Sequence, residues 1–123
     1  MKNLTKLFII SFFIILNACT KADDTPDPTA TIVDKWWCDS NGKLASQFFK
    51  ADGTWEQGSK GGTLNDKGNW ALSSDKRKIL ITNVVGKYQT LKNWEYELTS
   101  STATILELNY KAFNIKMSMV VCK

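Results

Sequence analysis

The chain has 123 residues, of which 43% are hydrophobic and 23% are charged. This composition excludes a largely disordered chain, and the length favours a single domain. The formal net charge of +4 is spread along the chain, and the only basic run, residues 76–78, follows the turn-like segment "LSSD". Because no nucleic-acid-binding motif accompanies this mild positive charge, we expect no nucleic acid partner.

The first 18 residues have the pattern of a secretory signal peptide. Residues 1–6 carry two lysines and no acid, and "LFIISFFIIL" at residues 7–16 contains no charge. A membrane span needs about 20 apolar residues, so this run is too short to remain in a membrane. A basic start and a short apolar run followed by small residues predict a signal peptide at residues 1–18.

The segment Leu16, Asn17, Ala18 and Cys19 resembles the lipobox of bacterial lipoproteins. Leucine three places before the cysteine and a small residue directly before it match that pattern, whereas Asn17 is a less usual residue at the middle position. The resemblance implies cleavage after Ala18 and lipidation of Cys19, with a lipid anchor of two or more acyl chains, which holds a protein stably. The alternative is a secreted protein in which Cys19 forms a disulfide.

Residues 19–30, which include "TKADDTPDPTA", are predicted to form an extended, flexible tether. The segment is rich in Pro, Asp and Thr and has almost no large apolar side chain, so it cannot pack a core. A lysine followed by acidic residues also resembles the surface-export signal of Bacteroidetes lipoproteins, although Ala22 interrupts that pattern. The resemblance implies the outer membrane with the domain facing the cell surface, and a generic hydrophilic linker explains the same residues nearly as well.

Residues 31–123 are predicted to form an antiparallel strand meander with no convincing helix. Eight strands are expected, at residues 33–39, 44–50, 54–58, 68–73, 77–83, 87–98, 103–109 and 113–122. The Asn-Gly and Asp-Gly pairs at residues 41–42 and 52–53 favour hairpin turns, and "SSDK" and "TSST" can close two more. No connection is long enough for a crossover helix, which disfavours parallel pairing.

Apolar and polar residues alternate along these strands, so each strand has one apolar face. The longest series is Phe113, Ile115, Met117, Met119 and Val121. An eight-stranded sheet buries all of these faces when it closes on itself, and closure also removes exposed edges. We therefore predict an all-β fold, an up-and-down antiparallel β-barrel of about eight strands.

Four stretches, "DKWW", "FFKADGTW", "GNWALSSDKRKILIT" and "WEYELTSSTATILEL", together resemble the lipocalin-like domains of small Bacteroidetes lipoproteins. Their order and spacing carry the resemblance, since each stretch alone is common. Lipocalins have Gly-x-Trp on the first strand, and here Asp34 stands at the glycine position while Trp36 matches the tryptophan. The resemblance implies that Trp36 closes one end of the barrel, and it assigns no ligand-binding residue.

Once Cys19 is assigned to lipid, Cys38 and Cys122 remain in an oxidising compartment. In an up-and-down barrel the first and last strands are neighbours, so this pair can form a disulfide across the seam. The alternative is two separate reduced thiols.

The aromatic side chains are the candidate functional feature. Those expected to point inward at different heights are Phe49, Trp55, Trp70, Trp94 and Tyr96. They either fill the barrel or line a cavity for a small apolar or aromatic ligand. Trp37 faces opposite to Trp36, where it either contacts carbohydrate or protein, if exposed, or covers an open barrel end.

The residues for common catalytic and metal sites are missing. The chain has no histidine, and Cys38 and Cys122 are too far apart in sequence for a metal-binding pattern. Glu95 and Glu97 share one strand face, where charges that keep a barrel soluble are the simpler explanation. We expect a lipid-anchored binding protein with no enzymatic activity, metal or cofactor. The alternatives are a protein-binding module, such as a lysozyme-inhibitor-like barrel, or an accessory surface glycan-binding lipoprotein.

Overall fold

The computed structural model of the chain describes residues 27–87 and 89–123. The predicted signal peptide at residues 1–18, the predicted lipidation residue Cys19 and most of the predicted tether lie outside these residues. Within the described part, no helix is long and apolar enough to cross a membrane.

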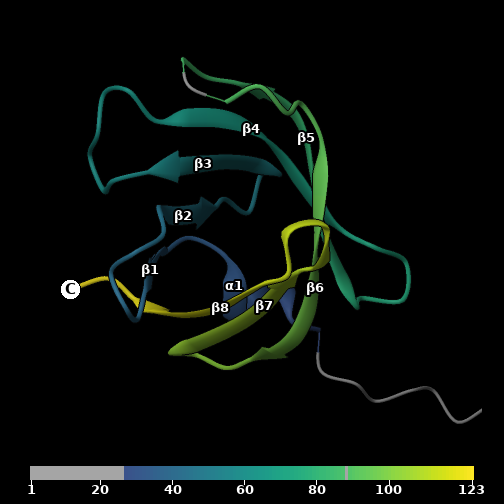
Figure 1. Cartoon of the computed structure of the whole chain (residues 1–123). Helices are drawn as coiled ribbons and strands as arrows, with labels where there is room; N and C mark the ends of the chain where they lie inside the picture. Colours follow the sequence, from purple (N-terminus) through teal and green to yellow (C-terminus); the bar gives the residue numbers. More distant parts are fainter. Residues whose placement is uncertain (1–26, 88) are drawn as a thin grey trace, which may run out of the picture.

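Eight antiparallel strands form a closed barrel, in which each strand pairs with its neighbours in the chain and the last pairs with the first (Figure 1). The strands are β1 (Trp36–Asp39), β2 (Ser46–Phe49), β3 (Thr54–Gly58), β4 (Asp66–Leu72), β5 (Lys78–Val85), β6 (Trp94–Ser101), β7 (Ile105–Tyr110) and β8 (Ile115–Val121). A short helix α1 (Thr29–Ile32) precedes β1, and the 3-10 helix η1 (Lys111–Phe113) joins β7 to β8. The predicted all-β, eight-stranded up-and-down barrel is confirmed.

Some boundaries differ from the sequence prediction because the chain turns within segments that were expected to be extended. The first strand is predicted from residue 33, but the backbone turns at Asp34, which has φ 59°, and β1 begins at Trp36. The long strand predicted at residues 87–98 begins only at Trp94. On the N-terminal side of β1, the helix α1 begins at Thr29, inside the segment predicted as the tether.

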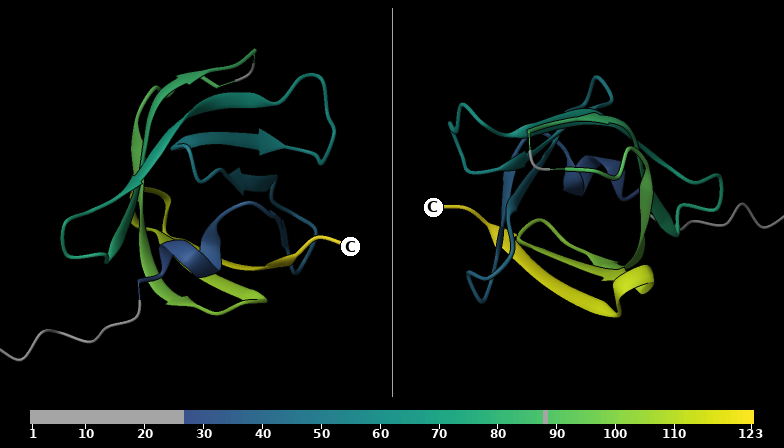
Figure 2. Two further views of the ribbon diagram at one scale, coloured as in Figure 1. Left: turned by 180° about the vertical axis from the view of Figure 1, so that it is seen from behind. Right: turned by 45° about the horizontal axis from the view of Figure 1, so that its top comes forward.

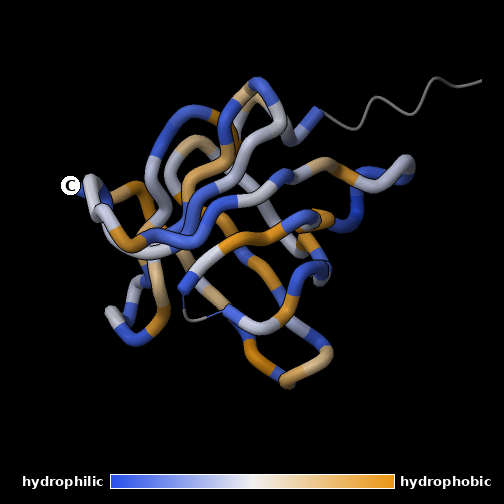
Figure 3. Tube along the Cα trace, turned by 90° about the horizontal axis from the view of Figure 1, so that it is seen from above, coloured by the Kyte–Doolittle hydropathy of each residue, from blue (hydrophilic) through white to orange (hydrophobic). Residues whose placement is uncertain are grey.

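Hydrophobic and hydrophilic residues alternate along the strands (Figure 3). The hydrophobic ones form the buried core inside the barrel. In β8, Met117 and Met119 are buried and Lys116 is exposed, as the alternation predicts. The prediction that Phe113 also faces inward is wrong, because Phe113 is 58% exposed. It belongs to η1, and the strand alternation starts only at Ile115.

The turns between the strands have the chemistry that their sequences indicate. Gly42 and Gly53 adopt φ of 66° and 86°, a left-handed conformation that glycine reaches without strain. In the β4–β5 turn, the Ser73 hydroxyl donates to the Asp75 carboxylate at 2.6 Å. In the β6–β7 turn, the Thr102 hydroxyl accepts a hydrogen bond from the backbone N–H three residues later.

The connections gather alternately at two ends of the barrel. The β2–β3, β4–β5 and β6–β7 turns lie at one end, and α1 lies across that end (Figure 2). We call this the closed end. The β1–β2, β3–β4, β5–β6 and β7–β8 connections lie at the opposite end, which we call the open end.

Contacts on both sides attach α1 and the residues after it to the closed end. Ile32 is fully buried and belongs to the hydrophobic core. The hydroxyl of Thr31 is hydrogen-bonded to the hydroxyl of Ser101 at the end of β6. The backbone N–H of Asp34 donates to the carbonyl of Phe49 at 2.8 Å, at the end of β2. Residues 29–34 are therefore part of the folded barrel.

A disulfide joins Cys38 of β1 to Cys122, the residue after β8, with 5.1 Å between the Cα atoms. The two strands are paired there, and the N–H of Cys122 donates to the carbonyl of Trp36 at 2.9 Å. The predicted disulfide across the barrel seam is confirmed. Because it links residues 84 apart, it stabilises the fold by about 4.5 kcal/mol in the chain-entropy account.

Candidate functional site

The open end of the barrel contains a hollow of about 170 Å³, which we call the inner hollow. Its walls come from the inner faces of the strands and from the β1–β2 and β5–β6 loops. The residues that line it include Gln47, Gln57, Trp94, Tyr96, Tyr110 and Met117. No lining side chain carries a formal charge, so the hollow is aromatic, aliphatic and amide in character.

The structure places the five candidate aromatic residues inside the barrel but divides their roles. Phe49, Trp55, Trp70 and Tyr96 are at most 7% exposed, and Trp94 is half-buried. Only Trp94 and Tyr96 line the inner hollow. The sequence alternation therefore predicts the inward direction of these side chains but not which of them border empty space.

Aromatic side chains fill the closed end, and their indole N–H groups are paired. The rings of Phe49 and Trp70 pack edge to face with centroids 5.4 Å apart, and Trp70 Nε1 donates to the carbonyl of Lys50 at 2.8 Å. Trp37 is fully buried, and its Nε1 donates to the carbonyl of Ile32 in α1 at 2.9 Å. The barrel is thus filled at one end and hollow at the other.

The position of Trp37 corrects the role predicted for Trp36. Trp36 lies on the outer wall, where its ring packs against Phe48 at 5.3 Å, and Trp37 closes the barrel end instead. The register of β1 with β2 places Trp37 opposite the buried Gln47 and Trp36 opposite Phe48. Since Trp37 is fully buried, the exposed contact with carbohydrate or protein that was considered for it has no basis.

A buried polar chain runs across the barrel interior. Trp55 Nε1 donates to Gln47 Oε1 at 3.1 Å, and Gln47 Nε2 donates to the hydroxyl oxygen of Tyr96 at 3.3 Å. An indole N–H can only donate, so the Gln47 amide oxygen must face Trp55 and its NH₂ group must face Tyr96. Gln47 is 1% exposed, and these bonds satisfy an amide that would be costly to bury alone.

The hydroxyl of Tyr96 remains protonated over the ordinary pH range. Burial raises the pKa of Tyr96 to about 12, and the neighbouring Trp94 and Gln47 side chains offset part of this increase. A protonated hydroxyl that accepts from Gln47 keeps its own hydrogen available for donation.

The indole of Trp94 differs from the paired indoles of the core. Its ring packs edge to face against Trp55 at 5.3 Å and against Tyr96 at 6.4 Å. Its Nε1 is buried and has no hydrogen-bond partner among the described residues. Buried donors without an acceptor are uncommon in folded proteins, and Trp94 lines the inner hollow, so this side chain is a candidate binding position.

A second hollow of about 450 Å³ lies on the outer wall, between the β5–β6 loop and η1, and we call it the outer groove. Trp94 and Tyr110 line both the outer groove and the inner hollow. Leu91 and Phe113 contribute exposed apolar side chains to the groove. The two hollows therefore share an aromatic wall.

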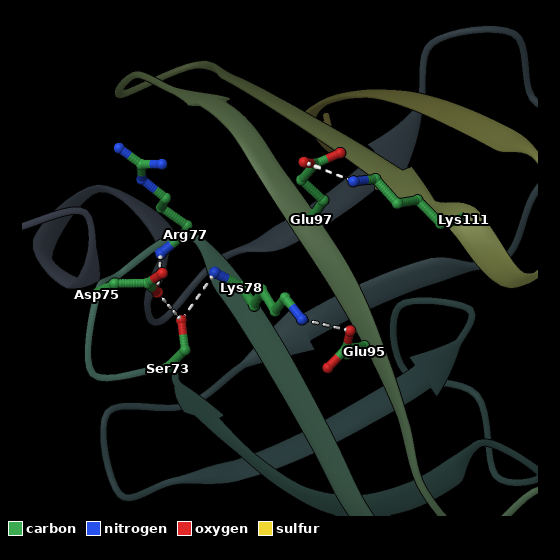
Figure 4. Close-up of polar contacts among 7 residues, drawn as sticks. All are labelled: Ser73, Asp75, Arg77, Lys78, Glu95, Glu97 and Lys111. Carbon is green, nitrogen blue, oxygen red and sulfur yellow. Dashed lines mark hydrogen bonds and ion pairs between the residues drawn. The ribbon is translucent and has the colours of Figure 1, made fainter.

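Charged residues at the outer groove are paired with one another (Figure 4). Lys78 Nζ lies 2.7 Å from Glu95, and Lys111 Nζ lies 2.9 Å from Glu97. The hydrogen bond from Lys111 lowers the pKa of Glu97, which keeps it a carboxylate. The two glutamates project outward from β6, as the sequence alternation predicts, and each belongs to an ion pair.

Sequence reasoning did not select Gln47 or Tyr110 as site residues, although a signal for each was present. Gln47 stands two residues before Phe49, in phase with the inward face of β2. Tyr110 continues the inward series of Leu106 and Leu108 in β7. Both were discoverable by extending the alternation to a polar residue and to a strand end.

Among the described residues, no group of three or more His, Cys, Asp or Glu side chains is placed to hold a metal ion. Comparisons with models of protein families, with curated proteins and with solved structures find no match. The candidate site is therefore defined by the geometry of this chain.

Proposed function

We propose that this chain is a lipid-anchored, lipocalin-like protein that binds a small apolar or aromatic ligand at the open end of its barrel. The observation that carries the proposal is the uncharged, aromatic inner hollow in a barrel whose other end is filled. Ligand sites are typically apolar concavities with a few polar groups, and Gln47, Trp94 and Tyr96 supply such groups here.

The size of the two hollows indicates how the ligand lies. The inner hollow, about 170 Å³, is smaller than the roughly 300 Å³ or more of typical ligand sites. The outer groove adds about 450 Å³ beyond the wall formed by Trp94 and Tyr110. In our proposal one ring of the ligand enters the barrel, and the remainder lies across these two aromatic residues.

The position of the first described residue fits a lipid anchor on Cys19. Asp27 lies at the closed end, where its carboxylate is 3.5 Å from Lys76 of the β4–β5 turn. Cys19 stands eight positions before Asp27, and an extended chain over that separation spans at most about 28 Å. A lipid on Cys19 therefore keeps the closed end nearest the membrane and leaves the open end toward the aqueous phase. The proposed location is the bacterial outer membrane, with the domain facing the cell surface.

We propose binding rather than catalysis for this site. The inner hollow has no charged lining residue, and Glu95 and Glu97 are each in an ion pair with a lysine. These features support a site that recognises shape and apolar surface.

Binding can be tested with N-phenyl-1-naphthylamine, a neutral aromatic probe whose fluorescence rises when it leaves water. Ala45 is exposed and lines the inner hollow, so Ala45→Trp should block the hollow and weaken probe binding by about tenfold or more. Ala71 is exposed on the outer wall of β4, and Ala71→Trp is the matched control with unchanged binding. Absence of saturable binding, or equal binding by both variants, contradicts the proposal.

Anchoring requires a separate experiment on the full chain expressed in a bacterial host. The parent chain should partition into the detergent phase and carry the mass of a lipid on its N-terminal peptide. The variant Cys19→Ala should remain in the aqueous phase with no added lipid mass. Equal partitioning of the two chains would count against the anchor.

A further inference from the structure

The polar atoms at the base of the inner hollow are predominantly donors. Gln47 Oε1, the acceptor of that amide, is already engaged by Trp55 Nε1. Gln47 Nε2 then donates to Tyr96, so the Tyr96 oxygen serves as an acceptor within the protein. The hydrogen of the Tyr96 hydroxyl is left to donate, because the bond from Gln47 uses only the oxygen.

A second donor lies on the same strand face. Trp94 and Tyr96 are two positions apart in β6, and both line the inner hollow. Trp94 Nε1 is buried without a hydrogen-bond partner within the described chain. The Trp94 side chain interacts with the Tyr96 hydroxyl and lowers its pKa in part, so the indole N–H and the O–H lie beside each other.

The charges around the site favour a neutral ligand. No lining residue of the inner hollow is charged, and the nearest lysines of the outer groove, Lys78 and Lys111, are paired with glutamates. Burying a carboxylate without a cation costs more than two neutral donors return, and an ammonium group would meet further donors. Gln57, which also lines the hollow, carries an amide that pairs with either kind of group.

We propose that the inner hollow selects neutral cyclic ligands that carry a hydrogen-bond acceptor, such as a ring carbonyl, which accepts from the Tyr96 hydroxyl and the Trp94 indole. This inference rests on the proposed function and adds the chemical class of the ligand. Burial raises the pKa of Tyr96 to about 12, so the hydroxyl remains a donor at any physiological pH.

Three probes with one ring system test the selection. 1-Indanone carries a ring carbonyl, indane carries no polar group, and 1-aminoindane carries an ammonium group at neutral pH. Their dissociation constants can be measured by NMR titration of the full chain with Cys19→Ala, following the indole N–H signals, with the Trp94 signal identified from Trp94→Phe. We expect 1-indanone to bind about three- to tenfold more tightly than indane, and 1-aminoindane to bind most weakly. The Trp94 indole proton should move downfield with 1-indanone and not with indane.

Conservative variants show which side chains donate a hydrogen bond to the ligand. Tyr96→Phe keeps the ring and removes one of the two donors, so it should reduce the preference for 1-indanone over indane without weakening indane. Trp36 lies on the outer wall against Phe48, away from the hollow, so Trp36→Phe removes an indole N–H there and should leave the preference unchanged. Because Tyr96→Phe also removes the acceptor of Gln47, Trp94→Phe is the second variant, and it should reduce the preference without affecting that bond.

The outcomes separate this inference from the proposed function. If indane and 1-indanone bind equally to the parent chain, the acceptor selection is wrong and the binding function stands. If none of the probes binds saturably, both are overturned. If the preference survives in both Tyr96→Phe and Trp94→Phe, the two donors do not act on the ligand and the inference fails.

Discussion

Both ends of the barrel contain tryptophans, but the two ends differ in whether the indole N–H groups are hydrogen-bonded. At the closed end, the indole N–H groups of Trp37 and Trp70 donate to backbone carbonyls, at 2.9 and 2.8 Å. At the open end, the indole N–H of Trp94 is buried and has no partner among the described residues. One end has the pairing expected of a folded core, and the other retains a donor and a hollow beside it.

The connections explain why the ends differ. The turns at the closed end contain three to five residues, and α1 lies across them with Ile32 in the core. The connections at the open end contain four to eight residues, and the only helix that they contain among the described residues is the three-residue η1. The closed end is therefore suited to stability and the open end to binding. Four predictions test this contrast.

The largest effect should come from the disulfide at the seam, which holds β1 and β8 together beside the closed end. Replacing both Cys38 and Cys122 by serine should lower the free energy of unfolding by about 4–5 kcal/mol, because the unfolded chain regains the freedom of a long loop. Urea unfolding followed by circular dichroism measures the change. Cys19→Ala is the control and should have no effect on unfolding, whereas a loss below about 1 kcal/mol in the double variant would show that the seam holds without the bond.

The next largest effect is the loss of stability when one isoleucine at each end is replaced by alanine. Ile32, the last residue of α1, is fully buried, and Ile32→Ala should cost about 2–5 kcal/mol. Ile115 is half-buried and lines the inner hollow, where it already lacks neighbours on one side, so Ile115→Ala should cost at least about 1 kcal/mol less. Urea unfolding of the two variants gives the comparison, and equal losses would mean that the open end is packed as firmly as the closed end.

A smaller effect compares two tryptophans. Trp70→Phe removes the indole donor to the Lys50 carbonyl and should cost about 0.5–1.5 kcal/mol beyond the lost ring area, because that carbonyl keeps only the N–H of Gly53. Trp94→Phe removes a donor that has no partner among the described residues, so only packing is lost. Circular dichroism is the appropriate measurement, since both changes alter the fluorescence. A greater loss for Trp94→Phe would indicate that its indole N–H is satisfied in solution.

The smallest effect is the pH dependence of the free energy of unfolding, and it should be similar for carboxylates at the two ends. At the open end, hydrogen bonds from the backbone, that of Lys43 first, lower the pKa of Asp39 below 3.8. At the closed end, the hydrogen bond from the Thr54 side chain lowers the pKa of Asp52. Because each folded pKa lies below the unfolded value, the stabilisation is present above pH 3.8 and is lost as the pH falls through the folded pKa.

The variants Asp39→Asn and Asp52→Asn test this dependence. Each should be less stable than the parent at pH 6, and the difference should shrink as the pH is lowered from 6 to 2. Unfolding by urea at a series of pH values measures it. A difference that grows on acidification would reverse the assigned sign. Similar behaviour at both ends would place the contrast in the barrel interior rather than in the turn carboxylates.

The barrel itself was predictable from the sequence because it depends on local patterns and on the order of the strands. Alternation with period two places Met117 and Met119 on one face wherever the strand pairs, and the Asn-Gly and Asp-Gly pairs specify turns in any antiparallel fold. The pairing of Cys38 with Cys122 followed from the neighbouring positions of the first and last strands. These features depend on strand periodicity and connectivity, which the residue order contains.

The tertiary structure decided which residue closes the barrel and where the hollow lies. Period-two alternation sets Trp36 and Trp37 on opposite faces, but the pairing with β2, in which Trp37 stands opposite the buried Gln47, decides which one faces inward. Hydrogen-bond partners come from residues distant in the chain, such as Gln47 and Tyr96, which are 49 positions apart. Whether a buried donor such as Trp94 Nε1 finds an acceptor depends on that three-dimensional packing, because no local sequence pattern encodes it.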